Sequence, residues 1–415
     1  MIVTKQIHTT EAVKRIRQIL DPGSFMEIGQ QITARQTDFY APEKAVESDG
    51  VISGYGSVEG RLVYIFSQDG ETMGGSFGEM HGGKIARLYR LALKTKAPII
   101  GLIDCSGLRI EEGLDSLDAF GALYALEAEA SGKIPQIMGI CGSCSGGMAV
   151  AANMADFVLT NKETLADDIR SLICLLPPNT SKGPEQESCR DDLNRLCPSL
   201  IEKRGKGREI LQELADDHCF FEVREKEGGG LVTGFLRMNG NVIGGIANHY
   251  GEDGNGKITG EGFDKAASFL ELCGKFHIPL LTVTDVKGFE GVREAGRMVK
   301  ALSAASVPKV NLIAGEILGS AYSILNCKGI GADYVFMWDC ASVSMIDPLQ
   351  AAELLYPQAE LAFLKKRAED YKQTHCSPTA LARHGYADKI IAPQDSRKYI
   401  LGAFETFANG GEAVR

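Results

Sequence analysis

The 415-residue chain lacks any run of 18 or more apolar residues, so no segment is expected to cross a membrane as a helix. An excess of positive charge is also missing: the formal net charge is −10, which argues against broad nucleic-acid binding and against adhesion to an anionic membrane. The N-terminal residues, MIVTKQIHTTEAVKRIRQIL, have no apolar core followed by a small-residue cleavage site. They predict an amphipathic helix rather than a signal peptide, and a cytoplasmic protein.

A second C-x-x-C pair is missing as well. Cys141 and Cys144 form a lone pair, which is weak evidence for a zinc site. A thioredoxin-type redox site would need the pair at a helix N-terminus in a much smaller domain. The 11 cysteines are odd in number and scattered, which favours reduced thiols over a disulfide framework. We therefore expect no metal, and we expect most of the other cysteines, such as Cys273, to be small core residues.

Histidine is scarce, and none lies between His81 and His218. This bears on GICGSCSGGMAV (139–150), which follows an apolar run and predicts a strand, a glycine turn and a helix. Its G-x-C-x-G sequence resembles a nucleophile elbow with cysteine in place of serine, but such an enzyme needs an acid and a histidine later in the same domain. The other interpretation is that Gly146 and Gly147 open a helix whose free N–H groups receive an oxyanion.

An internal repeat organises what is present. GYGSVEGRLVYIF (54–66) and GFLRMNGNVIGGI (234–246) each predict two strands joined at a glycine turn. Three further matches follow in the same order: KAPIIGLIDCSGLRI (96–110) with FHIPLLTVTDVKGFE (276–290), KIPQIMGICGSCSGG (133–147) with VPKVNLIAGEILGS (307–320), and MADFVLT (154–160) with GADYVFM (331–337). Four matched landmarks in one order indicate an internal duplication.

Each half combines continuous apolar strands with several helices, which is the pattern of a covered, largely parallel sheet. A chain of this length is expected to form two domains of the α/β class. We place an N-terminal domain at residues 1–165, a connecting segment at 166–220 and a C-terminal domain at 221–415. The connecting segment contains PPNTSKGPEQES and KRGKGR, which predict exposed loops.

Each half also contains two backbone turns that could bind a negatively charged oxygen. One turn ends a strand, at Gly107–Leu108 and at Gly288–Phe289; the other opens a helix, at Gly146–Gly147 and at Gly319–Ser320. Glycine lets a backbone approach a ligand closely, and two converging amide N–H groups form an oxyanion hole. No His or Glu recurs at matched positions as a general base. We therefore expect a chemistry carried by these amides.

Eight segments, in order along the chain, add a resemblance to a known family. In the first half they are DPGSFMEI (21–28), DGETMGGSFGEMHGGKIARL (69–88), DCSGLRIEEGLDSL (104–117) and CSGGMAV (144–150). In the second half they are GFDKAASFLELCGKFHIPLLTVTDVKGF (262–289), ASVPKV (305–310), GADYVFMW (331–338) and HGYADKIIAP (384–393). Together they resemble biotin-dependent acyl-CoA carboxyltransferases, such as the beta subunits of propionyl-CoA carboxylase and the carboxyltransferase subunits of methylmalonyl-CoA and glutaconyl-CoA decarboxylases.

The resemblance implies two tandem crotonase-type domains, each a ββα superhelix. The first half would bind the acyl-CoA and hold its thioester enolate at Gly107–Leu108 and Gly146–Gly147. The second half would bind biotin and polarise its ureido carbonyl at Gly288–Phe289 and Gly319–Ser320. The carboxyl group would move between biotin and the acyl-CoA through that enolate, in either direction.

The resemblance also implies substrate contacts and partners. Substrate contacts are expected from Arg109 and from Gly74, Gly75 and Ser76. No A-M-K-M biotinylation motif occurs, so biotin would arrive on a biotin carboxyl carrier protein or domain, together with a biotin carboxylase or a membrane decarboxylase subunit. Family active sites form between the first half of one subunit and the second half of another, which predicts a homo-oligomer, either a dimer or a trimer of dimers.

The chain departs from the family pattern after ADFVLT (155–160), where NKETLADDI (161–169) replaces a longer glycine-rich segment. Leu108 stands where alanine is usual and adds bulk beside the acyl site. Two alternatives therefore stay open: a non-catalytic scaffolding paralogue within a carboxylase or decarboxylase complex, and a crotonase-like hydratase or isomerase that acts without biotin. The latter would need a pair of catalytic glutamates, for which Glu111 and Glu112 follow the first turn.

Overall fold

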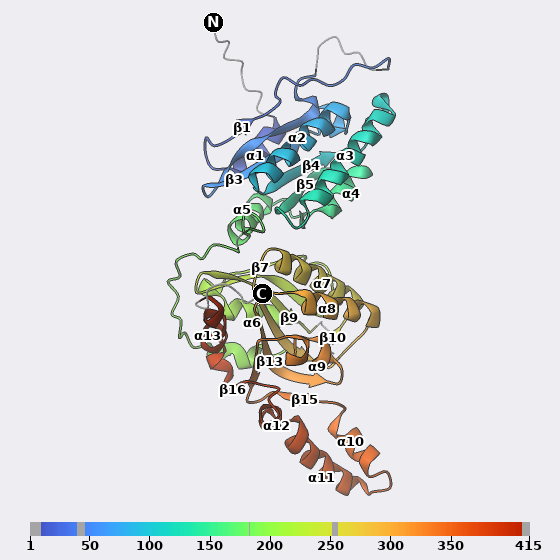
Figure 1. Ribbon diagram of the computed structural model, residues 1–415. Helices are drawn as coiled ribbons and strands as arrows, with labels where there is room; N and C mark the ends of the chain where they lie inside the picture. Colours follow the sequence, from blue (N-terminus) through green and yellow to red (C-terminus); the bar gives the residue numbers. More distant parts are fainter. Residues whose placement is uncertain (1–9, 40–45, 182, 251–255, 409–415) are drawn as a thin grey trace. The chain divides into compact units, whose positions relative to one another are not determined.

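The computed structural model describes residues 10–39, 46–181, 183–250 and 256–408 (Figure 1). Contacts divide the chain into two compact units, unit 1 (residues 1–183) and unit 2 (residues 184–415). The expected connecting segment is shared between them, since α5 (Leu165–Leu175) belongs to unit 1 and α6 (Gly207–Leu214) to unit 2. The limits after residues 165 and 220 stay predictions. Within the described ranges, no helix is both long and apolar enough to cross a membrane.

Unit 1 is built on one sheet whose strands lie in sequence order. It starts with a hairpin, because Glu59 (φ 48°) and Gly60 (φ 74°) adopt the left-handed conformation that joins two antiparallel strands tightly. The later strands are parallel to one another and nearly all buried at their starts. The strands are β1 (Met26–Glu27), β2 (Val51–Val58), β3 (Arg61–Gln68), β4 (Ile99–Cys105), β5 (Gln136–Cys144) and β6 (Phe157–Leu159).

The helices of unit 1 cover the sheet with their apolar sides. Helices α2 (Glu79–Thr95) and α3 (Leu114–Ala130) lie side by side, and α2 turns Ile85, Leu88 and Tyr89 into the core (Figure 1). Helix α1 (Glu11–Ile19) confirms the helix predicted near the N-terminus, although residues 1–9 of that prediction lie outside the described part. The remaining helices are α4 (Gly147–Met154) and α5.

Unit 2 repeats this scheme with a larger sheet, in the order β16-β14-β13-β11-β9-β8-β7. Its hairpin turns at Asn239 (φ 51°) and Gly240 (φ 72°), as the repeat predicted. The sheet strands are β7 (Phe220–Glu222), β8 (Leu231–Met238), β9 (Asn241–Asn248), β11 (Leu280–Val286), β13 (Lys309–Leu318), β14 (Tyr334–Trp338) and β16 (Lys389–Ile391). A short strand, β15 (Ser342–Ser344), pairs with the far end of β13, and β10 (Lys257–Ile258) pairs with β12 (Gly288–Phe289).

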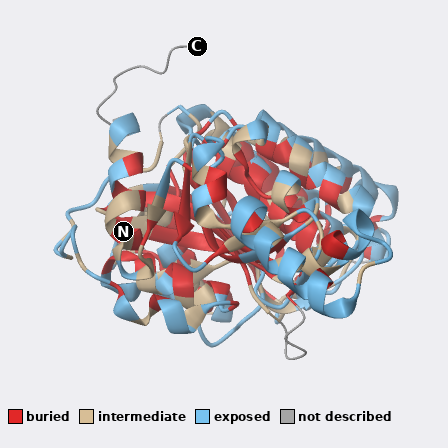
Figure 2. Ribbon diagram, turned by 90° about the horizontal axis from the view of Figure 1, so that it is seen from below, coloured by how far each residue is buried: buried red, intermediate tan, exposed pale blue. Residues whose placement is uncertain are grey.

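Buried residues gather on the strands and on the sides of the helices that face them within each unit (Figure 2). Helices α7 and α8 pack on each other, and α10 and α11 form a hairpin (Figure 1). Besides α6, the helices are α7 (Gly260–Lys275), α8 (Val292–Ala304), α9 (Ala321–Ile324), α10 (Pro348–Leu355), α11 (Leu361–Tyr371), α12 (Pro378–Arg383) and α13 (Ser396–Ala408).

Matched side-chain contacts confirm the predicted duplication. In unit 1 the carboxylate of Asp21 accepts the N–H of Gly60 at 2.9 Å, and in unit 2 the carboxylate of Asp216 accepts the N–H of Gly240 at 2.8 Å. Each aspartate therefore holds the hairpin turn of its own unit. Two unrelated domains would have no reason to place the same clamp at the same turn.

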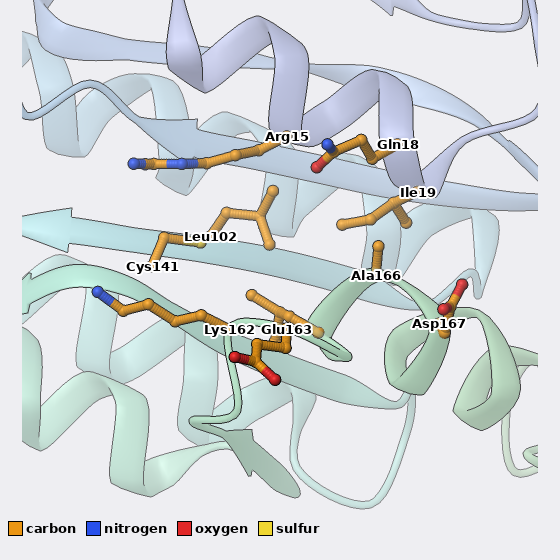
Figure 3. A pocket seen from close by; sticks show the side chains of 10 residues that line it. Arg15, Gln18, Ile19, Leu102, Cys141, Lys162, Glu163, Ala166 and Asp167 are labelled. Atoms are coloured by element: carbon orange, nitrogen blue, oxygen red, sulfur yellow. The ribbon is translucent and has the colours of Figure 1, made fainter.

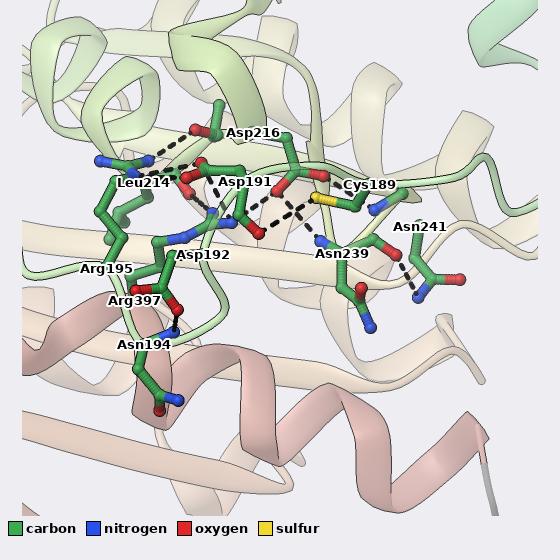
Figure 4. A network of polar contacts seen from close by, with 12 residues as sticks. Cys189, Asp191, Asp192, Asn194, Arg195, Leu214, Asp216, Asn239, Asn241 and Arg397 are labelled. Atoms are coloured by element: carbon green, nitrogen blue, oxygen red, sulfur yellow. Dashed lines mark hydrogen bonds and ion pairs between the residues drawn. The ribbon is translucent and has the colours of Figure 1, made fainter.

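Asp216 also anchors the C-terminal helix of unit 2 through a buried ionic network (Figure 4). Arg397, at the start of α13, lies 2.6 Å from Asp216 and 3.3 Å from Asp191, and it is fully buried. Burial raises the pKa of Asp216, but the N–H of Gly240 and the charge of Arg397 outweigh it and lower that pKa below its usual value. The network keeps the carboxylate of Asp216 charged inside the protein.

Candidate functional site

The sheet of unit 1 brings its two predicted turns together. Cys105, the last residue of β4, pairs in register with Cys144, the last residue of β5, so the turns that follow are neighbours. The hydroxyl of Ser145 donates to the carbonyl oxygen of Ser106 at 3.0 Å and ties one turn to the other. This adjacency is what an oxyanion hole built from two turns requires.

Backbone geometry explains why these turns need glycine. Gly107 has φ +122° and Gly146 has φ +55° with ψ −130°, conformations that a side chain disfavours strongly. Gly147 is restricted by space instead, because a Cβ there would lie 2.9 Å from the hydroxyl of Tyr124 and 3.0 Å from the ring of Phe120. The glycines that the sequence singled out are therefore held by conformation at two positions and by packing at the third.

Three amides at these turns remain available. Leu108 pairs with Phe77 in a parallel bridge that uses the carbonyl of Gly107 and the N–H of Arg109, so the N–H of Leu108 points the other way. Gly147 is the first residue of α4, and the first N–H groups of a helix have no intrahelical acceptor. Among the described residues, the N–H groups of Leu108 and Gly146 also have no hydrogen-bond partner.

Unit 2 contains the same strand-end turn in the same register. The N–H of Glu290 donates to the carbonyl of Ile258 at 2.8 Å, as the N–H of Arg109 donates to the carbonyl of Phe77 at 2.9 Å in unit 1. Phe289 thus occupies the place of Leu108, and alternation along the strand directs its N–H away from β10.

The helix-opening turn of unit 2 differs from its counterpart. The N–H of Gly319 donates to the carbonyl of Ser344 on β15 at 2.7 Å, so this amide is already used. The N–H of Ser320 has no such partner in the described part of the chain. Unit 1 has no strand in the place of β15 among its described residues, because the chain passes from β6 directly to α5. The two units therefore offer different numbers of open amides.

Matched aspartates brace the strand ends below both sets of turns. Asp104 accepts the N–H of Ser143 at 3.1 Å in unit 1, and Asp285 accepts the N–H of Glu316 at 2.9 Å in unit 2. Arg15 pairs with Asp104 at 3.0 Å. Both aspartates lie in one pair of the repeated segments, residues 96–110 and 276–290, but only the structure reveals that they accept these hydrogen bonds.

Arg109 lies inside the protein below the first turn of unit 1. Its side chain is 2% exposed; it pairs with Asp49, lies 2.9 Å from Glu112 and donates to the carbonyl of Ser76 at 2.7 Å. These contacts occupy the guanidinium, so it supports the turn rather than facing a ligand. Glu112 is likewise held by this ion pair, which removes one of the two glutamates that a hydratase would use.

The neighbouring glycines also pack against the strand that leads into the turn. A Cβ at Gly75 would lie 1.9 Å from the carbonyl oxygen of Asp104, and one at Gly74 would lie 2.9 Å from the hydroxyl of Ser106. The carbonyl of Gly74 also accepts the N–H of Ser106 at 3.1 Å. The structure thus places Gly74, Gly75 and Ser76 behind the turn, where they shape it.

The cysteines near the turn do not carry thiolate character. Burial raises the pKa of Cys144 and of Cys141, which keeps both thiols protonated. His81 cannot activate them, because it is buried, hydrogen-bonded to Gln68, and has its pKa lowered by burial to about 3. In the described ranges, no group of three or more His, Cys, Asp or Glu side chains could hold a metal ion.

Each unit contains a pocket of substrate size. In unit 1 a pocket of about 500 Å³ lies between α1 and the start of α5, with Arg15 and Lys162 extending along it from opposite walls (Figure 3). In unit 2 a pocket of about 450 Å³ is lined by Lys287, which precedes Gly288, and by Leu318, which precedes Gly319. The second pocket therefore adjoins both predicted turns of its unit.

Tyr124 and Ser145 are the site residues that sequence reasoning missed. Tyr124, on α3, donates its hydroxyl to the carbonyl of Gly147 at 2.8 Å. A tyrosine in the middle of a helix predicts only packing, and no sequence pattern indicates which carbonyl it meets.

Comparisons with known proteins cover nearly the whole chain. The carboxyl transferase domain profile matches residues 9–166 and 160–412. The propionyl-CoA carboxylase beta chain of Roseobacter denitrificans is 30% identical, over 96% of this chain and 90% of its own length. The methylmalonyl-CoA decarboxylase subunit alpha of Propionigenium modestum is 31% identical, over 95% of this chain and 89% of its own.

A solved structure agrees with the architecture. Transcarboxylase 12S, described as a hexamer assembly with methylmalonyl-coenzyme A and methylmalonic acid bound, superposes with a TM-score of 0.89 at 27% identity. The match covers 97% of this chain and 90% of the solved chain. The expected fold, two tandem α/β units of the crotonase type, is confirmed.

Proposed function

The chain belongs to the carboxyl transferase domain family and is a carboxyltransferase of the propionyl-CoA carboxylase or methylmalonyl-CoA decarboxylase type, and from this premise we propose which residues perform the transfer. Unit 1 binds the acyl-CoA and stabilises its enolate with the N–H groups of Leu108, Gly146 and Gly147. Unit 2 receives biotin and donates to its ureido carbonyl from Phe289 and Ser320. The observation that supports this most is the junction of the two turns of unit 1 by Ser145 and Ser106, with open amides on both sides of it.

The proposed carboxyl transfer depends on backbone amides and needs few side-chain acids or bases. An enolate oxygen carries developing negative charge, and fixed amide donors stabilise it without the reorganisation that water would need. Removing one such donor costs roughly 100- to 1000-fold in kcat. Biotin, when bound, would give up a carboxyl group and take the α-proton in exchange, or do the reverse in decarboxylation. The chain itself then has to bind, orient and exclude water.

The residues of unit 2 fit a small neutral ligand with a carbonyl group. The pocket of about 450 Å³ adjoins both turns, and the N–H of Ser320 remains open beside it. Since Gly319 already donates to Ser344, Ser320 and Phe289 are the donors that we assign to biotin. Among the described residues, the helix-opening turn of unit 2 has one open amide fewer than that of unit 1. A neutral carbonyl oxygen needs less stabilisation by donors than the negatively charged oxygen of an enolate, so this turn suits the carbonyl of biotin.

We further propose that the working enzyme is a homo-oligomer in which unit 1 of one copy faces unit 2 of another, supplied with biotin by a separate carrier protein. Both units expose large apolar side chains that a single chain leaves in water. Ile110 and Leu114 are 88% and 80% exposed in unit 1, and Met345 and Leu354 are 79% and 72% exposed in unit 2. The solved relative is described as a hexamer assembly, which supports association.

The test removes one amide at a position whose own φ suits proline. Ser320 has φ −65°, the value that proline imposes, so Ser320→Pro deletes the N–H without changing φ at that residue. We expect Ser320→Pro to keep acyl-CoA binding, measured by calorimetry, and to lose biotin-dependent carboxyl transfer by roughly 100-fold. Ser320→Ala keeps the amide and should retain activity within about twofold.

Gly147→Ala tests the acyl-CoA side, because a Cβ there would lie 2.9 Å from the hydroxyl of Tyr124, so either the turn or the tyrosine that anchors it has to shift. We expect carboxyl transfer to fall at least roughly tenfold. Gly83→Ala, on α2, introduces a Cβ with nothing within 4 Å and serves as its control. A wild-type chain that binds no acyl-CoA and transfers no carboxyl group across acetyl, propionyl, methylmalonyl and glutaconyl esters would overturn the proposal in favour of a scaffolding role.

A further inference from the structure

We infer that Tyr124 is a positioning residue for the helix-opening turn of unit 1, and that its hydroxyl does there what a β-strand does in unit 2. The kinetic consequence rests on the proposed function, whereas the structural consequence does not. Tyr124 lies two-thirds of the way along α3, and its hydroxyl donates to the carbonyl oxygen of Gly147 at 2.8 Å. Because Gly147 opens α4, this bond fixes the first peptide plane of the helix, between Gly147 and Met148, and so holds the turn that carries the N–H groups of Gly146 and Gly147.

A row of aromatic rings holds the hydroxyl in place. The ring of Phe77 stacks on that of Phe120 with centroids 3.9 Å apart, and Phe120 meets Tyr124 at 5.7 Å. Phe77 is itself bonded to the first turn, since its N–H donates to the carbonyl of Gly107 at 2.8 Å. The row therefore links the two turns through the buried side, while Ser145 links them through the exposed side.

The equivalent turn of unit 2 is held by a different device. There the N–H of Gly319 donates to the carbonyl of Ser344, and β15 closes the edge of β13. In unit 1, β6 pairs only with residues 137–139 of β5, and within the described residues no second strand pairs with the far end of β5. The turn of unit 1 therefore has, in the described part of the chain, no neighbouring strand to which it could hydrogen-bond as Gly319 does. The hydrogen bond from Tyr124 to the carbonyl of Gly147 holds it instead. Anchoring through the Gly147 carbonyl has the advantage that it leaves the N–H of Gly146 open.

The hydroxyl is also in the state that this role needs. Burial raises the pKa of Tyr124, so the group remains a protonated donor at neutral pH. Tyr124 thus acts on the turn by fixing the direction of one of its peptide groups, and it is not itself one of the amide donors.

Tyr124→Phe removes only the hydroxyl and keeps the ring in the aromatic row. We expect kcat for carboxyl transfer to fall about 5- to 10-fold, the value of one hydrogen bond, with the KM for acyl-CoA within about twofold of wild type. Hydrogen–deuterium exchange should quicken in the peptide covering residues 145–154 and stay unchanged in α2. Tyr55→Phe is the matched control, because Tyr55 is 36% exposed and its hydroxyl has no hydrogen-bond partner in the described ranges.

The outcomes distinguish the structural claim, that Tyr124 anchors the turn, from the kinetic claim, that this anchoring raises kcat. Faster exchange at 145–154 together with a lower kcat supports positioning of the turn. Unchanged exchange in Tyr124→Phe overturns it, as does a variant whose kcat matches wild type while KM alone rises, since that indicates packing around the ligand. If the wild-type chain shows no carboxyl transfer, the proposed function fails, and the exchange of residues 145–154 still decides whether Tyr124 anchors the turn.

Discussion

Raising the pH from 5 to 7.5 should destabilise unit 1 by about 3 kcal/mol through one residue, Glu127. This glutamate lies on α3 and is 1% exposed. The hydroxyl of Tyr89 donates to its Oε1 at 3.4 Å, while its Oε2 has no partner in the described part of the chain. Burial outweighs that single hydrogen bond and raises the pKa of Glu127 from 4.5 to about 8.

The direction follows from which state binds the proton. Between pH 4.5 and about 8 the folded protein keeps Glu127 protonated, whereas the unfolded chain has released the proton. The free energy of unfolding therefore falls as the pH rises through this window, by up to about 1.4 kcal/mol per pH unit, and is constant above and below it. The change per pH unit is smaller near both ends of this range, because the unfolded chain is still partly protonated near pH 5 and the folded protein is partly deprotonated near pH 7.5. The total loss of unfolding free energy between pH 5 and 7.5 is therefore about 3 kcal/mol.

Glu127→Gln keeps the shape of the protonated acid and removes its titration. Urea unfolding followed by circular dichroism at pH 5, 6, 7 and 7.5 should show the variant gaining on wild type as the pH rises. Trp338, the single tryptophan, lies in unit 2, so its fluorescence gives an internal reference that should not change. Glu129→Gln is the control, because Glu129 is exposed on the same helix and pairs with Lys133 at 3.3 Å. A difference between Glu127→Gln and wild type that stays constant across this range would refute the reasoning.

Three further outcomes are expected. Cys144→Ser should leave carboxyl transfer within several-fold of wild type, because the thiol is held protonated and an amide is the working group; a complete loss in a folded variant would revive a nucleophilic cysteine. Gly83→Ala should raise the free energy of unfolding by roughly 0.5–1 kcal/mol, measured by urea titration, since the new methyl meets nothing and α2 gains helix propensity. Arg397→Met should destabilise unit 2 by about 3–5 kcal/mol, seen in the fluorescence of Trp338, because Asp216 is left buried without its cation; a loss below about 1 kcal/mol would show that the network is dispensable.

The sequence was sufficient to predict the turns at which both units need a glycine for its backbone conformation. Gly60 and Gly240 were predicted as matching hairpin turns, and both adopt positive φ beside a residue that also does. Gly107 and Gly146 were predicted as special turns, and their conformations are ones that favour glycine. Such positions are readable because the residue type itself carries the constraint.

The sequence was insufficient where a contact depends on distant packing. Arg109 looks available beside a turn, yet Asp49, 60 positions away, and Ser76 enclose its guanidinium. The bond from Tyr124 to Gly147 and the use of the Gly319 amide by Ser344 also depend on which elements the fold sets side by side. No periodicity or spacing encodes these pairings, because each joins segments whose order in space is fixed only by the whole unit.

The C-terminal end of β5, which extends beyond its pairing with β6, has a consequence for the engineering of this chain. Unit 2 inserts β15 and the α10–α11 hairpin between β14 and β16 without altering its hairpin clamp or its aspartate brace, so the fold tolerates a long excursion at this point. Unit 1 has the same clamp and brace, with only the residues from Thr160 to Thr164 between β6 and α5. That loop is therefore a suitable insertion point, at which a grafted strand or a fluorescent reporter could be placed beside the pocket that Lys162 lines while the rest of the unit keeps its shape.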